Sequence, residues 1–457
     1  GRPRLWIDRV FSVRGTGTVV TGTLVGGSLE IDQPVMVLPA GLSSRVRGLE
    51  THGMAVTHLP SGSRAALNLA GIEVGAVSRG DAVTGRNQLV PSDTINVMLH
   101  SLPALSYSIR TLSELKFYVG SAELLTQVRL LDREELMPNE ACLAQMRLER
   151  KAAVEFHDRF IVRDATRQDT VGGGIILDPL AYRVRGRDLR LPRTAPGAYK
   201  VLSKTRFPVR RLDLELLAAR VQATASDLVS IILQERGWVA WEELGKEVPL
   251  VPERLTQLLR ELEARREVVA LPSWVVAPAT WRLLTENLTQ EISAYHARYP
   301  LRAGLAREVL RSSMGMETKL FDEVIARLVE EGKLVASGAF VRLTGFRPTF
   351  DEQQAQEAAR ILEVVRAARF SPPDLERLLG ELAGEKEVVG ALLEQGRLVN
   401  IGKGLIYLDD TLAEVKTYVA EAVAATGAID VGTLRDVLGT TRKYAVALLE
   451  YMDQVGF

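Results

Sequence analysis

Cysteine is almost absent from this chain of 457 residues, in which Cys142 is the one copy. A single cysteine excludes a disulfide framework and a zinc site built from cysteines, and it fits a reducing compartment such as the cytoplasm. No stretch approaches twenty consecutive apolar residues, which excludes a membrane-spanning helix and predicts no membrane partner.

Net charge is lacking as well, because 57 Lys and Arg residues balance 57 Asp and Glu residues. This balance excludes binding of a polyanion over the whole surface, but it leaves room for a local basic site. The chain begins at Gly1 with no signal-like segment, so we expect a processed or excised piece. Hydrophobic residues at 46% and charged residues at 25% are typical of a soluble protein, and the length predicts three or more domains.

The first part of the chain, up to about residue 186, consists of short β-prone runs broken by glycine. Examples are the segments 5–13 and 18–23. Turn residues that recur about every 8–12 residues favour antiparallel barrels over strands that alternate with helices. A break at 87–91 divides this part, so we predict one β-barrel at 1–88 and a second at 89–186.

After Arg187 the glycines become rarer and a repeat of a helix, a turn residue and a short β run occurs four times. The turn positions are Arg266, Gly332, Gly396 and Gly456, which lie 60 to 66 residues apart. A winged helix fits this period, whereas the repeats of a helical solenoid are shorter, about 33–47 residues. We therefore predict four tandem winged helices, at 187–280 with a basic linker, 281–348, 349–410 and 411–457, the last with a truncated wing.

The last repeat shows how its helices begin and end. Asp430 can cap a second helix, Gly439 can end it, and Thr440 can cap the third helix. Apolar residues of the third helix then face inward, which leaves Arg442 and Lys443 exposed at its first turn, with Arg435 nearby on the second helix.

The third helices differ in charge at their first turns. Phosphates attract a helix N-terminus and cations but repel carboxylates. The first three repeats carry acids there, at Glu253, at Glu317, and at Glu385 and Glu387. The fourth presents Thr440, Thr441, Arg442 and Lys443 with no acid before Glu450. We therefore expect the fourth to grip an RNA hairpin and the other three to act as a spacer.

Tyr444 follows these residues directly. It could stack on an extruded base, or it could pack in the core, the commoner fate of an aromatic residue at such spacing.

The most distinctive segment is 11–22 (FSVRGTGTVVTG). It fails as a dinucleotide fingerprint, because the third glycine would fall at Val20 and no helix follows. From the residues alone it predicts a tight glycine turn between two strands, where backbone amides and Arg14 could meet an anion.

This segment resembles the second-domain signature of translation factors related to elongation factor Tu. More specifically, the chain resembles the bacterial selenocysteine-specific elongation factors, the SelB family. The segments that carry this resemblance are 4–9 (RLWIDR), 45–53 (RVRGLETHG), 66–71 (ALNLAG), 158–163 (DRFIVR), 170–179 (TVGGGIILDP) and 440–444 (TTRKY). The family has barrels of the elongation factor Tu domain 2 and 3 type followed by four winged helices.

The resemblance implies a function in UGA recoding. It implies selenocysteinyl-tRNA, an mRNA selenocysteine insertion hairpin and the ribosome as partners, for a cytoplasmic protein expected to be a monomer. It also implies an N-terminal GTPase domain that holds GTP and Mg²⁺. The sequence has no G-x-x-x-x-G-K-[ST] phosphate loop and no N-K-x-D segment, so we expect that domain to be missing and no catalytic residue here.

Positions of the first barrel match the family's aminoacyl-tRNA and selenocysteine pocket. The resemblance suggests Arg9, His52 and Arg79 as lining residues, together with Arg14, Gly15 and Gly17 of the glycine turn. A selenolate is anionic, so cationic groups could select it over serine. The alternative is that the arginines pair with nearby acids such as Asp8 or Asp81.

The segment 182–211 is the most basic part of the chain, with ten Lys or Arg residues against Asp188 alone. It could neutralise phosphates of the tRNA backbone, or it could be a solvated interdomain linker, which Pro192 and Pro196 favour.

Two other classes of function remain open. A DNA-binding regulator with tandem winged helices would need a second basic recognition helix, and a scaffold would bind only protein. For an enzyme or a metal site the signal is weak, because the histidines are scattered. His100, His157 and His296 are expected at the surface or in packing, and Cys142 is expected to be buried and inert.

Overall fold

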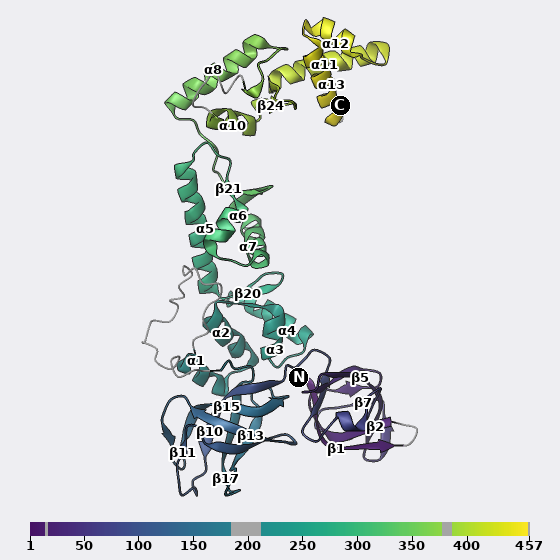
Figure 1. Cartoon of the computed structure of the whole chain (residues 1–457), viewed down its shortest axis with the longest axis vertical. Coiled ribbons are helices and arrows are strands. Elements are labelled where there is room, and N and C mark those ends of the chain that lie inside the picture. The colour runs from purple at the N-terminus through teal and green to yellow at the C-terminus, as the bar shows by residue number, and fades with distance from the viewer. Residues whose placement is uncertain (14–16, 184–211, 377–385, 456–457) are drawn as a thin grey trace. The chain divides into compact units, whose positions relative to one another are not determined.

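The computed structural model describes residues 1–13, 17–183, 212–376 and 386–455, and the chain divides into units at 1–283 and 284–457. The first unit holds two β-barrels and a helical module, and further helical modules follow in the second unit (Figure 1). We number these modules one to four in chain order. The predicted fold class, two antiparallel barrels followed by winged helices, is confirmed.

The first barrel is a ring of antiparallel strands in the order β4-β9-β1-β2-β8-β5, which the pairing of β5 with β4 closes. Its strands are β1 (Pro3–Val13), β2 (Gly17–Gly26), β4 (Pro34–Leu38), β5 (Leu42–Thr51), β8 (Arg64–Leu69) and β9 (Ala82–Gly85). The smaller elements are β3 (Leu29–Glu30), β6 (Met54–Val56), β7 (His58–Leu59) and the 3₁₀ turn η1 (Val74–Ala76). Aliphatic side chains at alternate positions fill the interior, such as Leu5 and Ile7 of β1.

The second barrel is closed in the order β10-β15-β13-β12-β16-β17. Its strands are β10 (Ser92–Ser101), β12 (Glu114–Val119), β13 (Ala122–Leu130), β15 (Ala141–Ala152), β16 (Arg159–Asp164) and β17 (Thr170–Asp178), with a side ribbon of β11 (Ile109–Arg110) and β14 (Glu135–Leu136). A Cβ on Gly174 would lie 1.8 Å from the carbonyl oxygen of Met98, so glycine lets β17 approach β10 this closely. Cys142 of β15 is buried, as predicted, and burial raises the pKa of its thiol to about 12.

The two barrels contact each other through β1. The ring of Trp6 lies against Gly120, where a Cβ would come within 2.3 Å of it. The hydroxyl of Ser121 donates to the carbonyl oxygen of Ile7 at 2.6 Å. Arg4 also reaches across and donates to the carbonyl oxygen of Ala153 at 2.9 Å.

Module one comprises α1 (Leu214–Ala219), η2 (Arg220–Gln222), α2 (Ala225–Arg236), β18 (Trp238–Ala240), α3 (Trp241–Glu247), α4 (Pro252–Ala264), β19 (Val269–Ala270) and β20 (Trp274–Val276). Thr224 and Asp227 form a capping box at the start of α2, and Gly237 ends the helix with a φ of 79°. The strands pair in the order β18-β20-β19, which gives the β hairpin of a winged helix.

Buried arginines join module one to the barrels. Arg220 donates to the carbonyl oxygen of Leu177 at 3.3 Å and to the carboxylate of Glu235 at 2.6 Å. Arg2 donates to four carbonyl oxygens between Gly245 and Leu250, at the end of α3 and just beyond it. Both side chains are almost fully buried, so this junction is a built interface of the first unit.

Module two repeats this order of a helix, a strand, two helices and two strands, and the described parts of modules three and four contain some of these elements. Module two has α5 (Pro278–Arg298), β21 (Leu305–Ala306), α6 (Arg307–Met314), α7 (Thr318–Glu330), β22 (Leu334–Ser337) and β23 (Phe340–Leu343). Module three has α8 (Glu352–Ala368), α10 (Lys386–Glu394), β24 (Leu398–Asn400) and β25 (Ile406–Leu408). Module four has α11 (Asp409–Thr426), α12 (Val431–Leu438) and α13 (Arg442–Gln454).

The predicted turn positions of the repeat have left-handed backbones. The φ angles are 61° at Arg266, 70° at Gly332 and 73° at Gly396, each directly after a third helix and before a strand. Gly456, the fourth predicted position, lies outside the described residues. Sequence periodicity therefore located the same turn in three successive modules.

Candidate nucleic-acid interfaces

The N-terminus of α13 presents the two predicted cations. Arg442 and Lys443 are exposed in the first turn, which contains no acid. Ala445, Leu448 and Met452 are buried on the opposite side of the helix, as the periodicity predicts. Two positive side chains and a helix N-terminus therefore face solvent together, an arrangement that attracts phosphate.

The helix before it begins and ends as predicted. The carboxylate of Asp430 accepts a hydrogen bond from the backbone amide of Thr433 at 2.8 Å, which caps α12. Gly439 ends α12 with a φ of 59°, and the amide of Thr440 then bonds back to the carbonyl oxygen of Arg435 at 3.1 Å. This turn sets the direction in which α13 starts.

Thr440 does not cap α13, and this prediction was wrong. Thr441 is the N-cap residue, and its side chain makes no capping hydrogen bond. The hydroxyl of Thr440 instead donates to the carbonyl oxygen of Phe370 at 3.0 Å and lies 2.8 Å from the hydroxyl of Ser371. Because the turn after Gly439 uses one residue more than expected, Thr440 faces module three.

Arg435 and Tyr444 are only partly available. The guanidinium of Arg435 lies 2.6 Å from the carboxylate of Asp436, an exposed pair that offsets its charge. The ring of Tyr444 is half-buried against the module core, and the Nζ atom of Lys443 lies 5.6 Å from its centre. The structure thus favours the packing alternative for most of the Tyr444 ring.

Carboxylates distinguish the third helices. Glu253 lies in the first turn of α4, Glu317 is the N-cap of α7, and Glu387 lies in the first turn of α10. Among these four described helices, only α13 has no acid at its N-cap or in its first turn. Its next acid, Glu450, forms an ion pair with Lys403 at 2.8 Å.

In the first barrel, Arg9, His52 and Arg79 are all exposed. Arg9 follows the irregularity in β1 at Asp8, and His52 forms the turn between β5 and β6 with a φ of 53°. Arg79 precedes Gly80, whose amide donates to the carbonyl oxygen of Ile7 at 3.0 Å.

Hydrogen bonds place Arg9, His52 and Arg79 in the same part of the barrel, around Asp8. The carboxylate of Asp8 binds Arg64 at 2.5 Å and Thr21 at 2.7 Å. Burial opposes its ionisation, but these hydrogen bonds outweigh burial and hold the pKa of Asp8 below its usual range. Thr51, which precedes His52, donates to the carbonyl oxygen of Arg64 at 2.8 Å.

The acids suggested as partners of these arginines are used elsewhere. Asp8 pairs with Arg64, and Asp81 lies 3.9 Å from Arg150. In the described part of the chain, neither Arg9 nor Arg79 forms an ion pair. Arg9 is close enough to Asp8 to help lower the pKa of that carboxyl, but Asp8 makes its hydrogen bonds to Arg64 and Thr21, so the guanidinium groups of Arg9 and Arg79 remain open to an anion.

Two other predicted regions lie largely outside the described residues. Arg14 and Gly15 of the glycine turn fall there, and so does the basic segment from residue 184 to residue 211. Gly17, the first residue of β2, is described and has a φ of 94°, which favours glycine.

Local sequence patterns do not reveal the buried arginines that join module one to the barrels. Arg2 lies more than 240 residues before its partner Leu250, and Arg220 lies 15 residues before Glu235, so no local pattern marks either arginine. For Lys403 the sequence does contain a local indication of its position, because the glycines at 402 and 404 that flank it are typical of the tip of a tight turn.

No metal or membrane element is apparent where the chain is described. Residues 1–13, 17–183, 212–376 and 386–455 contain no cluster of three potential metal ligands among His, Cys, Asp and Glu, and no helix that could cross a membrane. His100 is exposed, whereas His157 bonds to the carbonyl oxygen of Arg220 and His296 stacks on Phe346, as expected for surface and packing residues.

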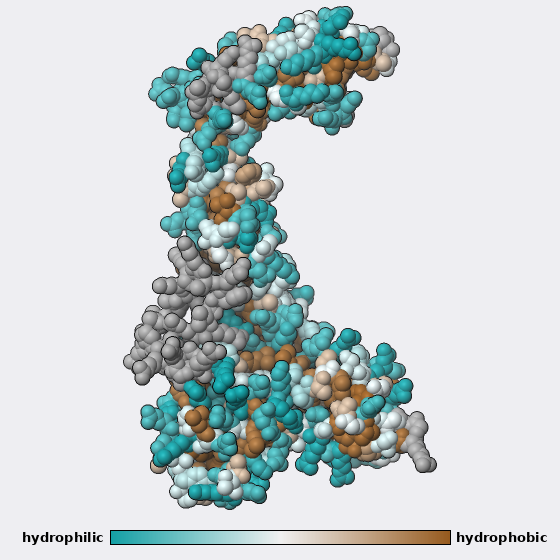
Figure 2. Space-filling view, viewed as in Figure 1, coloured by the Kyte–Doolittle hydropathy of each residue, from teal (hydrophilic) through white to brown (hydrophobic). Residues whose placement is uncertain are grey.

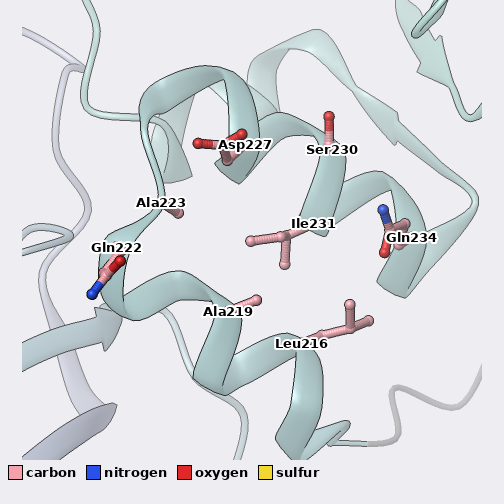
Figure 3. A pocket seen from close by; sticks show the side chains of 8 residues that line it. All are labelled: Leu216, Ala219, Gln222, Ala223, Asp227, Ser230, Ile231 and Gln234. Carbon is pink, nitrogen blue, oxygen red and sulfur yellow. The ribbon is translucent and has the colours of Figure 1, made fainter.

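An open depression of about 350 Å³ lies between α1 and α2 (Figure 3). Leu216, Ala219 and Ile231 supply apolar side chains, and the carboxylate of Asp227 already serves the capping box. Elsewhere, the surface in Figure 2 is a mixture of hydrophilic regions and scattered hydrophobic ones. The side chains that line the depression include no cation, so it lacks the positive charge that nucleic acid requires.

Models of known families match three parts of the chain. Residues 93–183 match "Selenocysteine-specific elongation factor, beta-barrel domain", and residues 289–343 and 421–457 match two models of "Elongation factor SelB, winged helix". The winged-helix matches include most of module two and the whole described part of α13.

Whole-chain relatives agree with these matches. The selenocysteine-specific elongation factor of Desulfomicrobium baculatum is 29% identical over 462 aligned residues, with 99% of this chain and 69% of that protein covered. The Haemophilus influenzae protein of the same name is 24% identical, with 99% and 70% covered. The crystal structure of a bacterial selenocysteine-specific elongation factor, EF-Sec, shares the fold with a TM-score of 0.61 at 18% identity, and the comparison covers 100% of this chain and 67% of that one.

Proposed function

Because the chain belongs to the SelB family of selenocysteine-specific elongation factors, we propose that it binds selenocysteinyl-tRNA and an mRNA hairpin together during UGA recoding on the ribosome. In this proposal the barrels hold the tRNA and module four holds the mRNA. Such a protein would act in the cytoplasm as a monomer. The two nucleic acids occupy different domains, so each can be tested alone.

The observation that carries the mRNA part is the charge of α13. Arg442 and Lys443 are exposed at its start, its first turn has no acid, and Lys403 compensates Glu450. Phosphate contacts from Lys and Arg supply most of the affinity for a nucleic-acid backbone. The acids of α4, α7 and α10 oppose the same use of the other third helices.

The observation that supports the tRNA part is the pair of uncommitted arginines in the first barrel. Since Asp8 and Asp81 pair with other arginines, Arg9 and Arg79 can meet the anionic selenolate or the terminal phosphate of the tRNA. The imidazole of His52, exposed on its turn, could donate a hydrogen bond to the same group.

GTP and Mg²⁺, which the family implies, do not fit the residues of this chain. The sequence contains no phosphate loop, and the described residues offer no carboxylate cluster suited to a metal. We therefore assign no nucleotide chemistry to these domains.

The decisive experiment is a titration of labelled RNA hairpins taken from downstream of recoded UGA codons, with duplex DNA and aminoacyl-tRNA as comparison ligands, at two salt concentrations. The double variant Arg442→Ala/Lys443→Ala should weaken hairpin binding roughly tenfold to a hundredfold and reduce the salt dependence by about two charges. Aminoacyl-tRNA binding should stay unchanged.

Arg254→Ala is the matched control, because Arg254 occupies the first turn of α4 and is also exposed. Equal hairpin binding by the double variant and the wild type would refute the mRNA assignment. Tighter binding of duplex DNA than of any hairpin would point to a DNA-binding regulator instead.

A further inference from the structure

Lys403 lies at the tip of the β24–β25 hairpin of module three, between two glycines. The φ angles of Gly402, Lys403 and Gly404 are 98°, 53° and 74°. A left-handed backbone is costly for a residue with a Cβ, so glycine would suit the middle position better. The turn itself therefore does not require a lysine at this position.

The Lys403 side chain reaches the next module. Its Nζ atom lies 2.8 Å from the Oε2 atom of Glu450 on α13. Both side chains are more than half exposed, at 64% and 53%, so the ammonium group stays open to solvent on its other sides.

Packing holds the hairpin in place beside α13. Ile401, Leu405 and Tyr407 belong to the same buried cluster as Leu448 and Met452 of α13. The two modules thus share one core here, and the position of Lys403 relative to α13 does not depend on the surface ion pair alone.

A hydrogen bond also joins module three to Thr440, the residue before the N-cap of α13. The hydroxyl of Tyr407 donates to the carbonyl oxygen of Phe370 at 3.1 Å, and the hydroxyl of Thr440 donates to this oxygen at 3.0 Å. Burial raises the pKa of Tyr407, so this hydroxyl remains a donor. Module three thereby orients the first turn of α13.

Glu450 matters because of where it lies on the helix. It follows Lys443 by seven residues, which places both side chains on the same face, about 10 Å apart along the axis. An uncompensated carboxylate there would repel a phosphate backbone that runs along this face. Lys403 supplies the opposite charge.

We propose that module three supports RNA binding by α13 through Lys403, a positioning residue that makes the surface of α13 usable by neutralising Glu450. The partner is the phosphate backbone of an RNA hairpin, so the inference rests on the function proposed above. Module three then takes part in RNA binding through Lys403, in contrast to the spacer role expected from the sequence.

A double-mutant cycle tests this inference in the intact chain. Lys403→Gln should weaken hairpin binding roughly threefold to tenfold at low salt, and less at high salt. Glu450→Gln should leave affinity equal or raise it. In the double variant Lys403→Gln/Glu450→Gln, the loss should largely disappear, because the charge that Lys403 compensates is gone.

Lys333→Gln is the control, since it removes a lysine that lies 2.8 Å from a carboxylate in module two, that of Glu331, which also pairs with Arg327. It should not change hairpin binding. No effect of Lys403→Gln, or an equal loss with and without Glu450, would overturn the inference. Absence of hairpin binding by the wild type would instead refute the proposed function, so the two failures are distinguishable.

Discussion

Arg4 and Asp158 form two parallel hydrogen bonds between the barrels, from Nη1 to Oδ2 at 2.6 Å and from Nη2 to Oδ1 at 2.5 Å. Arg4 is only 4% exposed. Burial acts to lower the pKa of Arg4, but the attraction of Asp158 outweighs it and raises the pKa. The ion pair thus places a positive and a negative group in the contact between the two barrels.

Replacing Asp158 by asparagine should strongly destabilise the first unit. Arg4 would then keep a buried charge without its partner, which typically costs about 3–5 kcal/mol. Urea unfolding measures this loss. Arg64→Ala, which breaks the exposed pair with Asp8, is the control and should cost at most about 1 kcal/mol. Similar values for both variants would contradict the importance of the buried pair.

The junction of module one and the second barrel should make stability depend on pH. Burial raises the pKa of Glu235 to about 7, and the negative charges of Asp178 and Glu247 act in the same direction. Arg220, which lies beside Glu235, acts to lower the pKa but is outweighed. The folded state therefore binds a proton that the unfolded state releases. Its stabilising contribution is complete below pH 4.5 and is lost as the pH rises through about 7.

Glu235→Gln isolates this effect. The free energy of unfolding of the wild type should fall between pH 4.5 and pH 7 by up to about 3 kcal/mol more than that of the variant. Urea unfolding at a series of pH values provides the comparison. Parallel pH profiles would show that Glu235 ionises normally in the folded state.

Two glycines of module three should respond to alanine in opposite ways. Gly390 lies inside α10 with open space where a Cβ would lie, so Gly390→Ala should stabilise the second unit by about 0.5–1 kcal/mol. Gly396 has a φ of 73°, so Gly396→Ala should destabilise it by about 1 kcal/mol or more. Thermal unfolding distinguishes them, and a shift of the same sign for both would contradict the assigned backbone.

Arg9 and Arg79 should contribute to selection of the aminoacyl group. Alanine at either position should weaken selenocysteinyl-tRNA about tenfold or more, and seryl-tRNA less, because a charge-assisted contact to the selenolate is lost. Equilibrium binding of both tRNAs gives the ratio. Arg86→Ala, an exposed arginine of the same barrel, should change neither. Equal losses for both tRNAs would assign the arginines to the tRNA backbone.

Local patterns in the sequence were enough to predict much of the fold. The periodicity located the left-handed turns at Arg266, Gly332 and Gly396, and residue types alone indicated the cap at Asp430. These features depend on neighbours within about one helical turn. The exposed cations of α13 were predictable for the same reason.

Long-range contacts account for what the sequence did not reveal. Thr440 was expected to cap a helix, but its partner, Phe370, lies 70 residues earlier in the chain. The ion pair of Glu450 with Lys403 could not be predicted, because the two residues are 47 positions apart in the chain. The fold likewise determines which acid pairs with which arginine, as in the pair of Asp8 with Arg64.

The carbonyl oxygen of Phe370 accepts hydrogen bonds from Tyr407 of one module and Thr440 of the next. Modules three and four are therefore joined by these side chains as well as by the connecting helix α11. Because they also share one buried cluster, we expect the last two modules to move together as one body.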